Sequence, residues 1–134
     1  MGTQKEMAEV EMTPIRIPFP NPIQDRFQLL VGPKMPEAGN GRHYYVVQAD
    51  NDPIPLLELQ FQCGALNEPD SKVNGVLTTV ILAALVDHLQ SFQEGEFASR
   101  ETALMITHLQ EVQNWAARRQ DDRSARGIQG KHAR

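Results

Sequence analysis

Hydrophobic and polar residues alternate in the first half of the chain and change to helical spacing in the second half. A period of two is clearest at residues 57–63, whose sequence is LELQFQC. Residues 43–48, rich in Tyr and Val, and the shorter residues 26–31 are further strand candidates. Turn-forming residues separate these segments, with Pro and Gly between the first two and Asn-Asp-Pro between the last two. The first half therefore predicts a small antiparallel meander.

The strongest helical pattern lies at residues 76–92. Asn74 is the expected N-cap, and one helical face collects Val76, Val80, Ile81, Leu85, Leu89 and Phe92. Leu77, Leu82 and Val86 make other sides of this helix apolar as well. A helix that is apolar nearly all round must be covered nearly all round. The pattern predicts a homo-oligomer, unless the sheet and a second helix cover the first helix by themselves.

A second helix is predicted to begin after Ser99, a good N-cap, and to stop at Gly127. Glu101 stands in its first turn, where the helix dipole favours an acidic side chain. Its apolar stripe comprises Leu104, Met105, Ile106, Leu109, Val112, Trp115 and Ala116. Because only residues 93–98 separate the two helices, they are expected to form an antiparallel hairpin.

The expected fold is therefore α+β, with a small antiparallel N-terminal sheet followed by a C-terminal two-helix antiparallel hairpin, in an oligomer. Residues 1–25 are expected to be a flexible or extended arm, since residues 1–12 are polar and residues 13–23 hold four prolines. Residues 26–134 are expected to form one domain, with the sheet at residues 26–63 and the hairpin at residues 74–127.

Composition and charge narrow the class of protein and its cellular compartment. The 134-residue chain is 40% hydrophobic, which is too much for a disordered chain, and no apolar run approaches the ~18 residues of a membrane span. The first residues have no apolar segment typical of a signal peptide, and the single cysteine, Cys63, suits a reducing compartment. A protein of the host-cell cytoplasm without a membrane partner is expected. The net charge is −4, yet residues 100–134 carry +3.

Motifs for catalysis are not found in the sequence. There is no GxSxG, HExxH, Walker loop or CxxC motif, and the four histidines lack metal-ligand spacing. A lone histidine on a helix, such as His88 or His108, usually belongs to a surface or an interface. We therefore expect a non-enzymatic protein without a metal or cofactor.

An anion-binding strip is predicted on the second helix. Trp115, Arg119, Arg123 and Arg126 follow at spacings of four, four and three, and so share one helical face. Guanidinium groups bind phosphate through a planar fork. The alternative is a helix end whose arginines interact with the dipole. Linear nucleic acid fits poorly, because the chain as a whole is acidic and the strip is short.

Aromatic side chains flank the loop between the helices. Phe92 and Phe97 offer faces on which a base can stack, and such stacking contributes roughly 1–3 kcal/mol per base. The competing interpretation is that both rings anchor the loop within the hairpin core.

The segment that contains these residues resembles the hairpin domain shared by phage Thoeris anti-defence and anti-CBASS signal sponges. The resemblance covers residues 42–134. Its most specific parts are FQ-x-G-x-F at residues 92–97, S-R-E-x-A-L at the start of the second helix, and RGIQGKH at residues 126–132, together with LELQFQCGALNE upstream. The order and spacing of these parts carry the resemblance.

The resemblance implies a function and an assembly. Members of the family bind cyclic ADP-ribose isomers made by TIR enzymes without cleaving them, so that the immune effector never meets its activator. Some relatives also take cyclic oligonucleotides at a second site. Family members form dimers that assemble into hexamers, in agreement with the homo-oligomer expected from the first helix.

Site residues follow from the resemblance position by position. Phe92 matches an adenine-stacking aromatic, Arg119 matches a phosphate-binding arginine, and Thr102 stands where relatives often have Asn. Trp115 and Arg123 join them through the strip, and Arg42 is the expected basic residue from the sheet. Cys63 and Ala65 replace the Asn and Pro of a common QFQNGP motif, which is expected to loosen that loop. Two other functions stay open: an enzyme that degrades such a signal, and an oligomeric hairpin adaptor.

Overall fold

The computed structural model describes residues 11–67 and 69–125, and of the last helix the side chains up to Asp122. The chain divides into two compact units, which are described separately. We call the first the sheet unit; it comprises the chain up to Gly64 together with Val73–Val76. We call the second the hairpin unit; it comprises Ala65–Lys72 and the chain from Leu77 onward.

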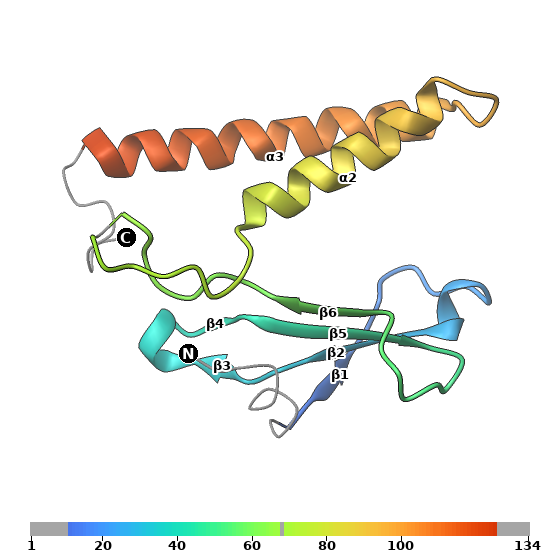
Figure 1. The fold of residues 1–134 in the computed structure, drawn as a ribbon. Coiled ribbons are helices and arrows are strands. Elements are labelled where there is room, and N and C mark those ends of the chain that lie inside the picture. The colour runs from blue at the N-terminus through green and yellow to red at the C-terminus, as the bar shows by residue number, and fades with distance from the viewer. Residues whose placement is uncertain (1–10, 68, 126–134) are drawn as a thin grey trace. The chain divides into compact units, whose positions relative to one another are not determined.

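The sheet unit contains a four-stranded antiparallel sheet in the order β1-β2-β5-β6 (Figure 1). Its strands are β1 (Thr13–Ile15), β2 (Phe27–Val31), β5 (Tyr44–Ala49) and β6 (Leu57–Gln60). The 3₁₀ helix η1 (Gln24–Arg26) leads into β2. Between β2 and β5 lie the short strands β3 (Lys34–Met35) and β4 (Gly41–Arg42), which pair around the 3₁₀ helix η2 (Pro36–Ala38).

The three strands predicted from the sequence are confirmed as β2, β5 and β6, although β6 ends earlier than predicted. Two details differ from the expectation. The segment predicted as a loop contains the β3–β4 pair, and three residues of the expected arm form the edge strand β1. Pro14 lies within β1, and an edge strand tolerates proline because one of its sides makes no ladder hydrogen bonds.

The core of the sheet unit lies on one sheet face, where Tyr44 and Val46 are buried and pack against Met12 and Leu30. The antiparallel register explains this grouping, because Leu30 pairs with Val46 and residues two apart point to the same face. Burial raises the pKa of the Tyr44 hydroxyl, and the nearby Glu58 carboxylate adds to this effect.

Both edges of the sheet are short or covered. At one edge β1 has three residues, one of which is proline. At the other edge Val76 pairs with the chain just after β6: its N–H donates to the Gln60 carbonyl, and its carbonyl accepts from Gln62 N, both at 2.8 Å. The Phe61–Val76 bridge runs parallel and closes residues 62–75 into a loop.

Polar side chains hold the base of this loop, which we call the neck. The Asn74 amide accepts from Cys63 N and donates to the Cys63 carbonyl, both at 2.8 Å. Gln62 Oε1 accepts from the backbone N–H groups of Asn74 and Gly75 at 3.0 and 3.3 Å. The expectation that Asn74 caps the first helix is wrong, because its side chain binds Cys63 and the N-cap is Leu77, with no side-chain cap.

The hairpin unit consists of α2 (Thr78–Gln93) and α3 (Arg100–Ala125), joined by a short loop (Figure 1). The helices contact each other through what we call the inner seam: Leu82, Val86, Leu89 and Gln93 of α2, and Thr102, Ile106, Leu109, Gln113 and Ala116 of α3. The spacings of three and four residues are those of two helices that pack along their length. The predicted hairpin is thus confirmed, and the buried residues of α2 are Leu82 and Val86, which the sequence pattern placed beside the main apolar face.

Side-chain bonds fix the loop between the helices. Ser99 caps α3 as predicted, since its Oγ accepts from Thr102 N at 3.0 Å. The Gln93 amide accepts from Ser99 N and donates to the Ser99 carbonyl, both at 3.0 Å. The predicted stop at Gly127 lies outside the described residues.

No helix among the described residues is long and apolar enough to cross a membrane.

Candidate functional site

Apolar residues that the inner seam does not use gather on one side of the hairpin. In both helices they stand one position before an inner-seam residue, which rotates them about 100° around the helix axis. Because the helices are antiparallel, this rotation turns both sets to the same side. We call this side the hairpin face: Ile81, Leu85, His88 and Phe92 of α2, and Met105, His108, Val112, Trp115 and Arg119 of α3.

The hairpin face is open in a single chain. Leu85, Phe92, Met105, Val112 and Trp115 are all among the exposed large hydrophobic residues. On α3 the spacing is again three and four residues, so the face forms a second seam beside the inner one. The opposite side of α3 is polar or small, with Ala103, Thr107, Gln110, Asn114 and Ala117. The hairpin therefore has one apolar and one polar side.

Phe92 and Thr102 lie at the end of the hairpin where the helices are joined. Phe92 is 40% exposed, and its ring lies nearly perpendicular to that of His88, with ring centroids 5.0 Å apart. Thr102 belongs to the inner seam, and its hydroxyl accepts from Ser99 Oγ at 2.9 Å. Phe92 is therefore partly open to solvent, whereas the Thr102 hydroxyl already takes part in the N-cap.

Trp115 and Arg119 lie much further along α3. Trp115 is 66% exposed, and Arg119 is exposed one turn later. The Arg118 guanidinium stands over the Trp115 ring, 5.6 Å from its centroid. Arg118 was not predicted as a site residue, although its position three residues after Trp115 is a signal for this contact. The side chain of Arg123, and the whole of Arg126, lie outside the described residues.

The predicted site residues form two groups on a single chain. Thr102 and Arg119 are seventeen residues apart on one straight helix, a separation of about 25 Å at 1.5 Å per residue. The structure brings Phe92 near Thr102, and Trp115 near Arg119, but one small ligand cannot touch both groups of the same chain. Arg42 is exposed on β4 in the sheet unit and stays a separate prediction.

The side chains on the hairpin face are aromatic, aliphatic and cationic. His108 Nδ1 lies 3.2 Å from Glu111 Oε1, and both side chains are largely exposed. Among the described residues there is no group of three His, Cys, Asp or Glu side chains that could hold a metal ion. Such a surface is suited to stack on a flat ring and to bind an anion.

Residues 57–121 match the family described as the Acb2/Tad1 hairpin domain. A stretch of 77 residues is 38% identical to Thoeris anti-defense 1 of Bacillus phage SBSphiJ7, which covers 58% of this chain and 53% of that protein. The matched part of the chain is therefore similar to the Acb2/Tad1 hairpin domain and to a phage Thoeris anti-defence protein. The chain spans about half the length of the curated relative that it matches.

The match to the Acb2/Tad1 hairpin domain runs from β6 through the neck and α2 to the later turns of α3. Phe92, Thr102, Trp115 and Arg119 all lie within the match, whereas Arg42 and Arg123 lie outside it. Asn74 holds the Cys63 backbone from both sides, and both bonds involve only the Cys63 main chain. The loosening of this loop by Cys63 and Ala65 stays a prediction.

Proposed function

We propose that this protein is a phage anti-defence protein that binds a cyclic ADP-ribose isomer without cleaving it. Two copies of the hairpin form each site, and the captured signal is withheld from its effector. The relationship to Thoeris anti-defense 1 supports the anti-defence role. The two groups of site residues are too far apart on one chain for a small ligand to contact both, and this separation supports the two-copy arrangement.

Antiparallel pairing of two hairpin faces joins the separated groups. If two α3 helices cross at Val112, Met105 of each chain meets Arg119 of the other, and His108 of each chain meets Trp115 of the other. Phe92, at the level of Met105 in the antiparallel hairpin, then lies beside Arg119 of the second copy. A two-fold axis makes both contacts at once and so creates two identical sites.

The chemistry of the joined groups fits a nucleotide. The exposed face of Phe92 stacks on a base, and Arg119 of the second copy donates to phosphate oxygens. The apolar residues between the two sites bury one another, which accounts for an exposed second seam on α3. A dimer of this kind requires no catalytic group, so the ligand leaves the site unchanged.

The arginine test compares Arg119→Ala with Arg16→Ala, an equally exposed arginine of the sheet unit. A charge-assisted bond contributes roughly 1.5–3 kcal/mol, so Arg119→Ala should weaken binding about ten- to a hundred-fold in calorimetry against a panel of cyclic nucleotides. Arg16→Ala should bind normally. Equal affinity for both variants would remove Arg119 from the site, and no binding by the wild type to any cyclic nucleotide would favour the adaptor.

The aromatic test compares Phe92→Ala with Phe97→Ala, the other phenylalanine near the loop, which is also exposed. Phe92→Ala should lose most of the binding with a small change in melting temperature. If Phe92 instead anchors the core, the variant should melt far below the wild type, since a core Phe→Ala change costs about 3–5 kcal/mol. Phe97→Ala should keep nearly full affinity.

Mixing the two single variants tests the two-copy site directly. In a mixed dimer, the Arg119→Ala chain supplies an intact Phe92, and the Phe92→Ala chain supplies an intact Arg119. One complete site is therefore restored, and binding should recover to a fraction of the wild-type sites. No recovery would mean that each chain forms its own site.

Cleavage is tested by recovering the ligand. After incubation with an excess of protein, heat denaturation should release the bound nucleotide, and chromatography should show it intact. A cleaved product would favour the alternative function of an enzyme that degrades the signal.

A further inference from the structure

The end of the hairpin where the two helices are joined has a polar interior (Figure 1). Of residues 90–105, three are partly buried and the rest are exposed: Gln93 at the end of α2, Ser99 just before α3, and Thr102 in its first turn. All three have polar side chains, whereas the neighbouring aromatic side chain of Phe92 is 40% exposed. Polar side chains inside and an apolar one outside reverse the usual arrangement, and such reversals are expected at functional sites.

Hydrogen bonds join Gln93, Ser99 and Thr102 into one network, which we call the polar clamp. The Gln93 amide accepts from Ser99 N and donates to the Ser99 carbonyl, both at 3.0 Å. Ser99 Oγ accepts from Thr102 N at 3.0 Å and donates to Thr102 Oγ1 at 2.9 Å. The polar clamp therefore ties the last residue of α2 to the first turn of α3. Networks whose members all have partners make a structure rigid.

Apolar packing is concentrated further along the hairpin. The buried residue of α2 nearest to this end is Val86, seven residues before Gln93 and so about 10 Å away along the helix axis. The backbone turns of the connecting loop run from Gly95 N to the Phe92 carbonyl and from Ala98 N to the Gly95 carbonyl, both at 3.2 Å, and neither reaches α3. The placement of the last turn of α2 against α3 therefore depends on the amide of Gln93.

We propose that the polar clamp pre-organises the ligand site, with Gln93 as its positioning residue. The proposal rests on the proposed function, in which Phe92 stacks on a base. Phe92 directly precedes Gln93 in the last turn of α2, so a turn that is held by Gln93 also holds the backbone of Phe92. Helix ends fray when nothing fixes them. A ring that is already in place loses less conformational freedom on binding than a ring on a frayed end.

Pre-organisation acts on how fast the ligand is captured. When only a fraction of the free protein has the competent arrangement, the apparent affinity falls by that fraction. This loss appears in the association rate constant, because a ligand that is already bound holds the ring and leaves as slowly as before. The loss of a direct contact with the ligand appears in the dissociation rate constant instead. The two rate constants therefore distinguish a positioning residue from a residue that touches the ligand.

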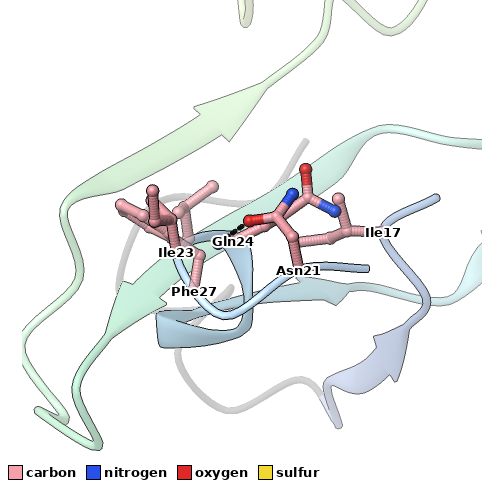
Figure 2. A pocket seen from close by; sticks show the side chains of 6 residues that line it. Ile17, Asn21, Ile23, Gln24 and Phe27 are labelled. Carbon is pink, nitrogen blue, oxygen red and sulfur yellow. Dashed lines mark hydrogen bonds between the residues drawn. The ribbon is translucent and has the colours of Figure 1, made fainter. Parts of the chain in front are cut away.

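A glutamine of the sheet unit provides a matched control. Gln24 is also partly buried and also fixes a loop: its Nε2 donates to the Pro18 carbonyl at 2.7 Å, and its N–H donates to Asn21 Oδ1 at 2.8 Å (Figure 2). Gln24 lies outside the residues that match the hairpin domain. Gln24→Leu therefore removes a loop-fixing amide without touching the hairpin.

The test measures binding of radiolabelled cyclic ADP-ribose isomers to the full chain. Calorimetry gives the dissociation constant, a chase with unlabelled ligand gives the dissociation rate constant, and their ratio gives the association rate constant. Gln93→Leu keeps the size of the side chain and loses the amide. It should lower the association rate constant about tenfold if about one free molecule in ten keeps the ring in place, with dissociation as in the wild type. Gln24→Leu should keep both wild-type rate constants, and circular dichroism checks that each variant is folded.

Ser99 allows a rescue by a conservative substitution. Ser99→Ala removes the hydroxyl that joins Ser99 to Thr102, and it should slow association as Gln93→Leu does. Ser99→Thr keeps a hydroxyl that can cap the helix, and it should restore the wild-type rate constant. Equal slowing by both substitutions would overturn the role of the hydroxyl network.

The outcomes separate this proposal from the proposed function. A wild type that binds no cyclic nucleotide overturns both. If the wild type binds and Gln93→Leu keeps both wild-type rate constants, the polar clamp does not pre-organise the site, and the site itself stands. Faster dissociation from Gln93→Leu would show that the amide touches the ligand, and fewer sites with unchanged rate constants would limit its role to stability, so either result overturns the positioning role. Slower association alone supports it.

Discussion

The two units of the molecule are held together in different ways. The sheet unit joins residues distant in sequence: a four-stranded ladder, a buried pair at Tyr44 and Val46, and the polar neck around Asn74. The hairpin unit joins two helices along the inner seam, where Leu82 and Val86 are the buried side chains among the described residues. The hairpin unit is more regular than the sheet unit, and its apolar side chains are less covered. In the proposed dimer, its stability therefore depends more on the surface shared with the second copy.

The largest expected effect distinguishes the inner seam from the hairpin face. Leu82 is 8% exposed and Leu85 is 44% exposed, on the same helix and with the same side chain. Leu82→Ala should lower the free energy of unfolding by about 2–5 kcal/mol, because it leaves a cavity between the helices. Urea denaturation measures this loss.

Leu85→Ala, the matched control, should act on association instead. The urea midpoint of the wild type should rise with protein concentration, and Leu85→Ala should flatten that rise. If both leucines cost the same stability at every concentration, the distinction between the inner seam and the hairpin face is wrong.

A middle-sized effect is expected at the neck of the sheet unit. A Cβ at Gly75 would lie 2.5 Å from both the Phe61 carbonyl carbon and its oxygen, so the backbone must shift to admit any side chain. Gly75→Ala should cost about 1–3 kcal/mol of stability, as overpacking does elsewhere. In Gly95→Ala the added methyl group meets nothing within 4 Å, so its melting temperature should stay close to that of the wild type. A wild-type melting temperature for Gly75→Ala would show that the neck opens easily.

The smallest effect is expected at the surface pair of Arg26 and Asp50. Arg26 Nε and Nη2 donate to the two Asp50 oxygens at 2.7 and 2.6 Å, and these bonds lower the pKa of the Asp50 carboxyl. A carboxyl with a lowered folded-state pKa stabilises the fold above its unfolded pKa of about 3.9. That contribution disappears as the pH falls through the lower folded value.

Asp50→Asn should therefore melt slightly below the wild type at pH 6, and the difference should shrink toward zero as the pH falls below about 3.9. Asparagine suits this position, because residue 50 has a φ of 53° and Asn tolerates the left-handed region. Asp25→Asn is the control, an exposed aspartate with no side-chain bond among the described residues. A difference that persists at the lowest pH would assign the effect to the backbone instead of the ion pair.

The sequence predicted local elements better than it predicted their partners. Period-two and period-3.6 patterns located β2, β5, β6, α2 and α3, because each depends on residues close in the chain. The role of Asn74 was misjudged. Its side chain would suit a helix N-cap as well as the observed bond, and its partner Cys63 is eleven residues away in the sequence. The inward side of α2 could not be selected from the sequence, because several sides are apolar and only the position of α3 selects Leu82 and Val86.

The candidate site was predictable in composition but not in arrangement. Phe92 and Arg119 were found through their residue types and through the resemblance, yet their separation along the hairpin follows only from the straight course of α3. The hydrogen bonds from Gln24 to the Pro18 and Phe19 carbonyls could not be predicted for a related reason. Prolines indicate an extended segment, but they do not reveal that Gln24 reaches back to Pro18 and Phe19.

The protected edges of the sheet bear on how much of this protein a cell can contain. In the proposed function each site holds one signal molecule, so the protein would have to accumulate to at least the abundance of the signal. Exposed sheet edges at such abundance invite strand-to-strand polymerisation. Both edge strands are short: β1 has three residues, one of them Pro14, and the four-residue β6 is followed by the pairing with Val76. The sheet therefore offers little free edge to which a further strand could be added at high concentration.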